Sequence, residues 1–153
     1  ARLATVAWRR NEHSPAAGAK ATSAIDNVLA LRSAQERGAD EAVLANTAGF
    51  LAEGTSSNVF LVVDGVLCTP ALSTGCLAGV TRALVCDLVP VVQRGDLTLD
   101  DLRGASEAFL TSSTRDVHPI ATIDGTPLTS APGPLTTAAA AAFASLQADT
   151  IDP

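Results

Sequence analysis

The amino-acid sequence predicts an α+β, or mixed α/β, fold and not a regular doubly wound α/β fold. Two apolar runs, residues 58–63 and 66–69, flank Asp64-Gly65, which is a strong hairpin signal, and strands joined by such turns form antiparallel sheets. Segments with helical periodicity lie between the strand-like runs. The 153 residues are 47% apolar and 17% charged, enough for one domain with a real core.

Strand-like runs occur along the whole chain. Residues 3–8 alternate as a half-buried strand does, and residues 9–15 are predicted to form a polar loop. The other predicted strands are residues 41–45, 50–53, 58–63, 66–69, 107–110 and 117–123, the last followed by an Asp124-Gly125 hairpin turn. Turn residues separate several of these runs, so antiparallel pairing is expected.

Four segments are predicted to be helical. The first begins at Thr22 or Ser23, whose hydroxyl would cap it, and ends near Gly38. The second opens at Gly79 and continues through Leu88, and the other two are expected at residues 96–102 and about 135–147. The apolar stripe expected to bury the first helix consists of Ile25, Val28, Leu29 and Leu31.

Composition argues against several classes of partner. A net charge of −6 and a pI near 4.7 argue against a nucleic-acid or anionic membrane surface, since both require a basic patch. No segment resembles a signal peptide or a membrane span. The odd number of cysteines, without CxxC spacing, is typical of buried thiols in a reducing cytoplasm, and no metal site is expected. The chain begins at Ala1 and contains no methionine, which suggests a processed product or a piece of something longer.

Lys20 is the only lysine in the chain. Its amine can bond covalently to a carbonyl carbon, whereas a guanidinium cannot, so Lys20 is the one side chain here able to carry a Schiff base. The alternative is an exposed lysine in an arginine-rich composition. The small residues 16–19 just before it would let a bulky group approach the backbone, or form a simple loop.

Several motifs agree in order and spacing with one family. They are Lys20 before a helix, Glu53 in the run 53–60, the Asp64-Gly65 hairpin, the segment 77–82, and the segment 109–114 leading to Pro119. This pattern resembles the class IV, fold-type IV, pyridoxal-phosphate enzymes, which include branched-chain and D-amino-acid aminotransferases and aminodeoxychorismate lyases. The resemblance covers nearly the whole chain and implies a large C-terminal domain, with a largely antiparallel sheet or partial barrel and flanking helices.

The resemblance implies a role for each motif. Lys20 matches the lysine that holds pyridoxal 5'-phosphate as a Schiff base and moves protons. Glu53 matches the carboxylate that faces the ring nitrogen and keeps it protonated. Leu77 would pack on the ring, and the phosphate would be held by Gly79, Val80, Thr81, Ser112 and Ser113. Ser56 and Ser57 could orient Glu53, touch the cofactor, or belong to a turn.

The resemblance also implies what lies outside this sequence. The family has an N-terminal domain that completes the substrate site, so residues 1–153 match only the C-terminal, cofactor-binding domain, and the other part could be a separate chain. The implied activity is amino-acid aminotransfer, of branched-chain or D-amino-acid type, between amino and keto acids in a homodimer. The alternatives are an aminodeoxychorismate lyase that releases pyruvate and 4-aminobenzoate, and a catalytically inert module.

Overall fold

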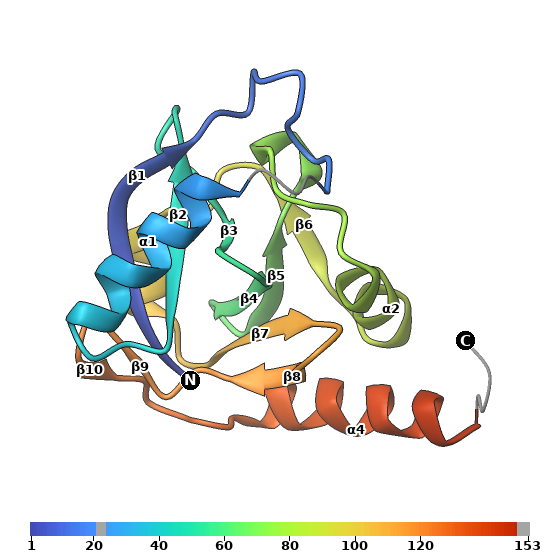
Figure 1. Cartoon of the computed structure of the whole chain (residues 1–153). Helices are drawn as coiled ribbons and strands as arrows, with labels where there is room; N and C mark the ends of the chain where they lie inside the picture. The colour runs from blue at the N-terminus through green and yellow to red at the C-terminus, as the bar shows by residue number, and fades with distance from the viewer. Residues whose placement is uncertain (21–23, 150–153) are drawn as a thin grey trace.

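Two five-stranded sheets form the centre of the protein, as shown by a computed structural model that describes residues 1–20 and 24–149 (Figure 1). One sheet has the order β10-β9-β1-β2-β3 and the other the order β6-β5-β4-β7-β8. The strands are β1 (Arg2–Arg10), β2 (Glu41–Asn46), β3 (Leu51–Gly54), β4 (Asn58–Val63), β5 (Val66–Pro70), β6 (Val92–Arg94), β7 (Ala108–Ser112), β8 (Asp116–Pro119), β9 (Thr122–Ile123) and β10 (Thr126–Pro127).

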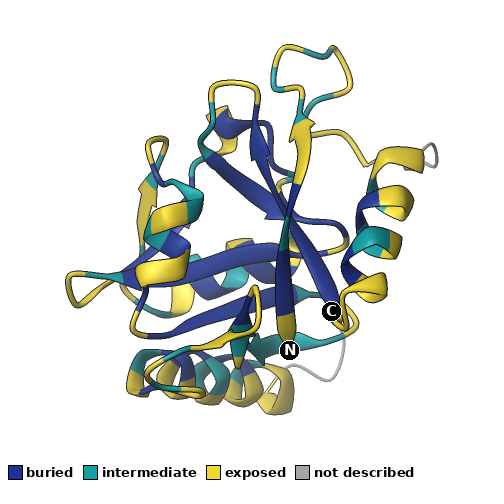
Figure 2. Cartoon of the chain, turned by 90° about the vertical axis from the view of Figure 1, so that its left-hand side faces the viewer, coloured by how far each residue is buried: buried dark blue, intermediate teal, exposed yellow. Residues whose placement is uncertain are grey.

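Helices cover the outer faces of both sheets. Helix α1 (Ile25–Glu36) lies on β1 and β2, whereas α2 (Val80–Leu88) and α4 (Pro134–Asp149) cover the second sheet (Figure 1). Helix α3 (Leu99–Gly104) and the short 3-10 helix η1 (Leu72–Thr74) lie in connections. The layer order is therefore helix, sheet, sheet, helices, and Figure 2 shows that buried residues concentrate in the strands.

Strand alternation explains the layers. In β4, Val59 and Leu61 pack between the two sheets, while Phe60 and Val62 pack under the helices. Phe60 stacks on Phe109, its partner in β7, with ring centroids 4.7 Å apart. In β2, Val43 faces the other sheet, and the next residue along, Leu44, faces α1. A one-residue shift in register would reverse these assignments, so the side-chain pattern fixes the pairing.

The α+β prediction is confirmed, and the pairing is largely antiparallel. Among the described residues, five of the eight strand pairings are antiparallel and three, β1–β2, β1–β9 and β5–β6, are parallel. The hairpins at Asp64-Gly65 and Asp124-Gly125 both form, with the aspartate and the glycine of each turn at positive φ.

Three predictions about local structure are wrong. The first strand continues through Arg9 and Arg10, because these residues pair with β2 after an irregular stretch. The run 117–123 is two strands that belong to different sheets. Strand β6 was not predicted, since it is short and pairs with β5 across the intervening α2 instead of through a turn.

The predicted apolar stripe of α1 is also wrong. Ala30 and Ala34 face the sheet and are fully buried, whereas Ile25 and Val28 are 62% and 58% exposed and Leu29 is also exposed. Small side chains let the helix approach the sheet closely, so its larger apolar side chains turn outward. The predicted cap at Thr22 or Ser23 lies outside the described residues.

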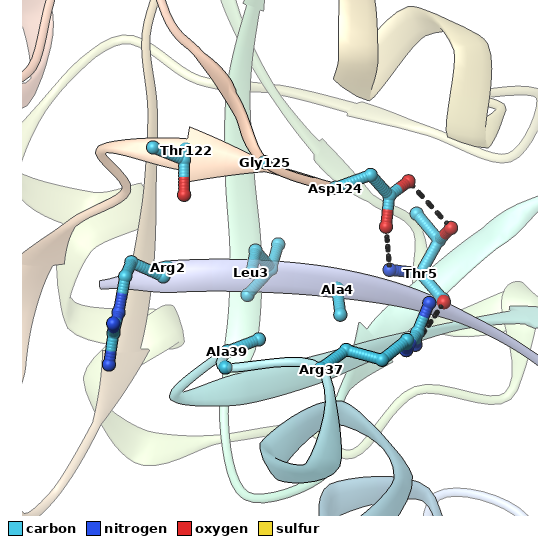
Figure 3. Close-up of a pocket in the computed structure, with 10 residues that line it drawn as sticks. Arg2, Leu3, Ala4, Thr5, Arg37, Ala39, Thr122, Asp124 and Gly125 are labelled. Carbon is cyan, nitrogen blue, oxygen red and sulfur yellow. Dashed lines mark hydrogen bonds between the residues drawn. The ribbon is translucent and has the colours of Figure 1, made fainter.

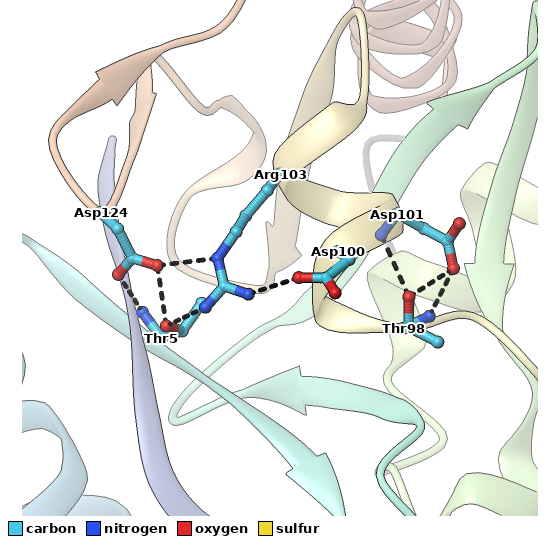
Figure 4. A network of polar contacts seen from close by, with 6 residues as sticks. All are labelled: Thr5, Thr98, Asp100, Asp101, Arg103 and Asp124. Carbon is cyan, nitrogen blue, oxygen red and sulfur yellow. Dashed lines mark hydrogen bonds and ion pairs between the residues drawn. The ribbon is translucent and has the colours of Figure 1, made fainter.

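A polar network on one side of the fold joins β1, α3 and the β9–β10 turn (Figure 4). Asp124 accepts hydrogen bonds from the backbone and hydroxyl of Thr5 and pairs with Arg103, which also pairs with Asp100. Thr98 and Asp101 form a capping box at the start of α3. These polar groups therefore already have partners within the protein, and their role is to stabilise the fold.

Candidate active site

The loop that carries Lys20 is held by hydrogen bonds at Glu12. This side chain accepts from the backbone and hydroxyl of Thr47, which hold the pKa of Glu12 down to about 2. Gly18, at positive φ, is a neighbour of Cys76, since a Cβ built on Gly18 would lie 3.8 Å from the Cys76 carbonyl oxygen. Lys20 itself is exposed and directly precedes the undescribed residues. Its loop therefore lies beside the segment that leads into α2.

Glu53 lies in β3 and is 8% exposed. One carboxylate oxygen accepts a 2.8 Å hydrogen bond from the backbone N–H of Leu77, and the other pairs with Arg10 at 3.1 Å. Glu53 is directly opposite Leu44 in the sheet, so it lies on the face that α1 covers. Because Leu77 follows Cys76, the segment that donates to Glu53 also lies beside the Lys20 loop.

The negative charge of the Glu53 carboxylate is only partly stabilised by its partners. Burial raises the pKa of its carboxyl, and the Leu77 N–H and the Arg10 charge only partly oppose that effect. The acid therefore lacks enough donors to stabilise its charge fully. A further cationic donor placed against it would be strongly attracted.

Arg10 links Glu53 to α1. Its guanidinium also donates to the side-chain oxygen of Asn27 at 2.8 Å, and Asn27 donates in turn to the Thr55 carbonyl at 2.7 Å. The buried Nε of Arg10 has no hydrogen-bond partner within the described part of the chain. Sequence reasoning missed both residues, because Arg10 was assigned to a loop and Asn27 to an unremarkable helix position.

The start of α2 is held close to β4. Gly79 is the N-cap of α2, and a Cβ at this position would overlap the side-chain oxygen of Asn58. Asn58 also donates to the Leu77 carbonyl at 2.8 Å. The first residue of α2, Val80, is 73% exposed, while Thr81 is buried, and no acid lies in the first turn. The unpaired N–H groups of this helix start, together with its positive dipole end, suit an anion.

The second predicted phosphate segment lies next to the first. Thr111 pairs with Asn58 in the sheet, so the end of β7 is adjacent to the residue that fixes α2. Ser112 and Ser113 follow at the end of β7 and in the turn, half-buried and exposed respectively. The Ser112 hydroxyl lies 3.3 Å from that of Thr114. The buried Thr111 hydroxyl has no hydrogen-bond partner among the described residues.

Ser56 and Ser57 do not bind Glu53. Their hydroxyls donate to Glu41, at 2.9 and 3.4 Å. Of the alternatives, orientation of Glu53 by a direct hydrogen bond is therefore wrong.

Two hollows are present on the surface. One, of about 360 Å³, is lined by Glu12, Gly18, Cys76 and their neighbours, and it lies between the Lys20 loop and the segment before α2. The other, of about 420 Å³, lies between β1, the end of α1 and the β9–β10 turn, where Thr5, Arg37 and Asp124 are already hydrogen-bonded (Figure 3). The second contains none of the predicted site residues.

The structure thus connects most of the predicted residues through backbone and amide contacts. Glu53 is joined to Leu77 by a direct hydrogen bond, and Asn58 joins Leu77 to Gly79. Ser112 lies one residue beyond the strand position opposite Asn58. Lys20 is connected only through its loop, since no hydrogen bond or ion pair joins it to Glu53 in the structure as described.

Comparison with known proteins assigns the family. A profile described as amino-transferase class IV matches residues 1–123. The chain belongs to the class IV aminotransferase family. Within this family, it is 39% identical over 106 residues to a branched-chain-amino-acid aminotransferase of Pseudomonas aeruginosa, covering 66% of this chain and 34% of that protein. It is also 39% identical over 122 residues to a D-alanine aminotransferase of Bacillus licheniformis, covering 76% and 43%.

Solved structures in the same family share the fold. A branched-chain aminotransferase from Thermoproteus uzoniensis superposes with a TM-score of 0.88 at 35% identity, over 95% of this chain and 50% of that one. A protein assigned as a 4-amino-4-deoxychorismate lyase from Legionella pneumophila gives 0.87 at 28% identity, over 97% and 55%. A branched-chain aminotransferase from Thermobaculum terrenum in its PLP form gives 0.87 at 32%, over 95% and 50%. This class IV chain therefore spans about half the length of these structures.

Other site types find little support among residues 1–20 and 24–149. In that part of the chain, no cluster of three or more His, Cys, Asp or Glu side chains could hold a metal, and no helix is long and apolar enough to cross a membrane. The three cysteines are free, and burial raises the pKa of each thiol.

Proposed function

We propose that this chain is the cofactor-binding half of a pyridoxal-phosphate-dependent amino-acid aminotransferase of branched-chain or D-amino-acid type. The observation that carries the proposal is Glu53, a buried carboxylate with only two donors, beside the segment that packs on the Lys20 loop. Named relatives of both aminotransferase types support the activity, and solved relatives with the cofactor support the cofactor.

The residues present fit pyridoxal 5'-phosphate. A protonated ring nitrogen would supply the cationic donor that Glu53 lacks. The phosphate would take the N–H groups at Val80 and Thr81 and the hydroxyls of Ser112 and Ser113, at a helix start with no acid in its first turn. Gly79 permits the close approach of the chain to Asn58 that sets this helix start, and Leu77 would line the ring.

The catalytic role belongs to Lys20. When bound, the cofactor supplies an electron sink for the charge that develops at the substrate α-carbon. The Lys20 amine would condense with the aldehyde with loss of water. Once the substrate amine had displaced it, the free amine would carry the proton to and from that carbon. Glu53 would hold the ring nitrogen in its protonated form, and Arg10 would maintain the charge of Glu53.

A second candidate is an aminodeoxychorismate lyase. The specific observation in its favour is the similarity to the Legionella pneumophila structure, which shares nearly all of this fold. The products separate the two. An aminotransferase makes a keto acid only when an amino acceptor is present, whereas the lyase releases pyruvate and 4-aminobenzoate without one.

The proposal includes a second domain and self-association. Residues 1–153 would form the C-terminal domain, and the remainder of the substrate site would come from an N-terminal domain, in the same protein or a separate chain. The exposed side chains of Ile25, Val28 and Leu29 offer an uncovered apolar helix face for such a contact. We expect a homodimer, which light scattering of the purified protein would show.

A cytoplasmic location completes the proposal. Its support is the set of three free cysteines, which suits a reducing compartment. Cell fractionation would test it.

Borohydride reduction followed by peptide mass mapping tests the proposal. When the protein is incubated with pyridoxal 5'-phosphate and then reduced with borohydride, one cofactor should be fixed on the peptide that contains Lys20. Lys20→Arg is the matched variant, because it keeps the positive charge but cannot form the carbon–nitrogen double bond. Labelling that persists in Lys20→Arg, or no labelling of the unmodified protein, would contradict the proposal, and the latter result would favour an inert module.

A further inference from the structure

A second buried carboxylate, Glu41, lies in the strand next to Glu53 and is 1% exposed. It starts β2 and lies opposite Leu3, which packs between the sheets, so it occupies the other face from Glu53. The proposed chemistry gives it no role. Its neighbours nevertheless include both segments that flank the proposed cofactor site.

Glu41 is bound by every residue of the loop that follows Glu53 and Gly54. The backbone and hydroxyl of Thr55 donate to one of its oxygens, and the hydroxyls of Ser56 and Ser57 donate to the other. Burial raises the pKa of Glu41, but these hydrogen bonds and the charge of Arg115 outweigh it and leave the pKa lowered. Glu41 is therefore a fixed negative charge in the folded protein.

Arg115 brings the second segment to the same carboxylate. Its guanidinium donates to Glu41 at 2.6 Å and to the Ser56 hydroxyl at 2.9 Å. The backbone N–H of Arg115 donates to the Ser112 carbonyl, which closes the turn that contains Ser113. The side chain of Arg115 is 27% exposed, so it lies at the edge of the interior.

We propose that Glu41 and Arg115 are positioning residues, which fix the distance between the ring end and the phosphate end of the cofactor site. The inference rests on the proposed function. Ser112 and Ser113 follow a strand end and have no other long-range side-chain anchor among the described hydrogen bonds, whereas Arg115 ties their turn across the molecule. Because a charge-assisted hydrogen bond to a buried carboxylate is short and directional, it suits this task.

The position of Arg115 gives a specific consequence. The Glu41–Arg115 pair holds the turn that would bind phosphate. Glu53, which would bind the ring, and the loop that carries Lys20 are held by other contacts, through Leu77 and Arg10 and through Glu12 respectively. Loss of Arg115 should therefore weaken only the interactions of the phosphate. Loss of Glu41 should affect both ends, because Glu41 also anchors residues 55–57.

The experiment compares two ligands, pyridoxal 5'-phosphate and pyridoxal, which lacks the phosphate. Dissociation constants for both would be measured by absorbance titration of the protein and of Arg115→Gln. The expected result is a loss of about tenfold in affinity for pyridoxal 5'-phosphate, with affinity for pyridoxal unchanged within about twofold. A merely structural role would weaken both ligands alike, so the ratio of the two constants is the decisive readout.

Two further variants keep the inference testable. Ser56→Ala removes one bridge to Arg115 and should lower the phosphate-dependent part of the affinity by a few fold, and added to Arg115→Gln it should have little further effect. Arg94→Gln, which breaks an exposed pair with Asp96, is the control and should change neither constant.

The outcomes separate the two proposals. A protein that binds neither ligand covalently contradicts the proposed function. Suppose instead that the protein binds both ligands and that Arg115→Gln leaves the affinity for pyridoxal 5'-phosphate unchanged, or lowers the affinity for both ligands equally. Either result keeps the proposed function and overturns the positioning role.

Discussion

Glu41 and Glu53 lie on neighbouring strands of one sheet and are both buried, yet their carboxyl groups behave in opposite ways. The pKa of Glu41 is lowered, while that of Glu53 is raised. Burial acts in the same direction on both. The difference comes from their partners. Within the part of the chain that the structure describes, Glu41 accepts from five residues, whereas Glu53 accepts from only Leu77 and Arg10.

Glu41 is a structural acid, whereas Glu53 can still accept further hydrogen bonds. An ionised carboxylate can accept about four hydrogen bonds. Glu41 has all of that capacity occupied, which makes it a clamp between loops. Glu53 has capacity left, which is the property that the proposed contact with the cofactor requires.

The largest expected effect is on stability at Glu41. Glu41→Ala leaves Arg115 and three hydroxyl donors without their acceptor, and a buried donor left without a partner costs about 1–3 kcal/mol of unfolding free energy. Glu53→Ala, with fewer partners, should cost clearly less. Urea unfolding of the two variants would measure the difference, and equal losses would remove the distinction between the two acids.

The next effect is on chemistry at Glu53. Glu53→Gln keeps the shape but loses the charge, so turnover of the proposed aminotransferase should fall by about 10²–10³-fold. Its thermal unfolding should change little. Steady-state kinetics with an amino acid and a keto acid would check this. A variant with full turnover would show that this acid has no role in the reaction.

The pH dependence of stability should differ in sign between the two acids. Glu41 binds its proton less readily in the folded state than the ordinary pKa of 4.5 implies, so its contribution is present above that pKa and is lost as the pH falls through the folded value. Glu53 binds its proton more readily, so the folded state loses stability as the pH rises above 4.5 through its folded pKa. The plot of unfolding free energy against pH should become flatter below pH 4.5 in Glu41→Gln, and flatter above pH 4.5 in Glu53→Gln. The opposite assignment would contradict the comparison.

The smallest effect on stability is expected at an exposed ion pair. Asp40 pairs with Arg2 at 2.7 Å, and this arginine holds the pKa of Asp40 down to about 2. Because both side chains are largely in solvent, Arg2→Gln should leave the unfolding transition unchanged within error. A clear loss of stability would show that a lowered pKa alone, without burial, marks a structural acid.

Sequence reasoning found the residues with distinctive chemistry and missed those defined by tertiary contacts. The single lysine, the Glu53 run and the hairpin turns are local patterns, and the fold class follows from them. Arg10, Asn27, Asn58 and the Glu41–Arg115 pair become visible only when strands distant in sequence meet. The roles assigned to the site residues all stay predictions, and these residues are Lys20, Glu53, Leu77, Gly79, Val80, Thr81, Ser112 and Ser113.

The error in α1 has a physical cause. Spacing showed that Ile25, Val28 and Leu29 share a face, but not which surface covers that face. The side chains that pack on the sheet are Ala30 and Ala34. Short parallel pairings such as β5–β6 were missed for a similar reason, because no turn signal announces them.

The central claim is that Glu53 holds the cofactor's ring nitrogen protonated. The most direct measurement is the ¹⁵N chemical shift of pyridoxal 5'-phosphate labelled at that nitrogen, bound to the protein and to Glu53→Gln. The account predicts a protonated nitrogen in the protein and an unprotonated one in the variant. An unprotonated nitrogen in the unmodified protein, or the same shift in both, would contradict it.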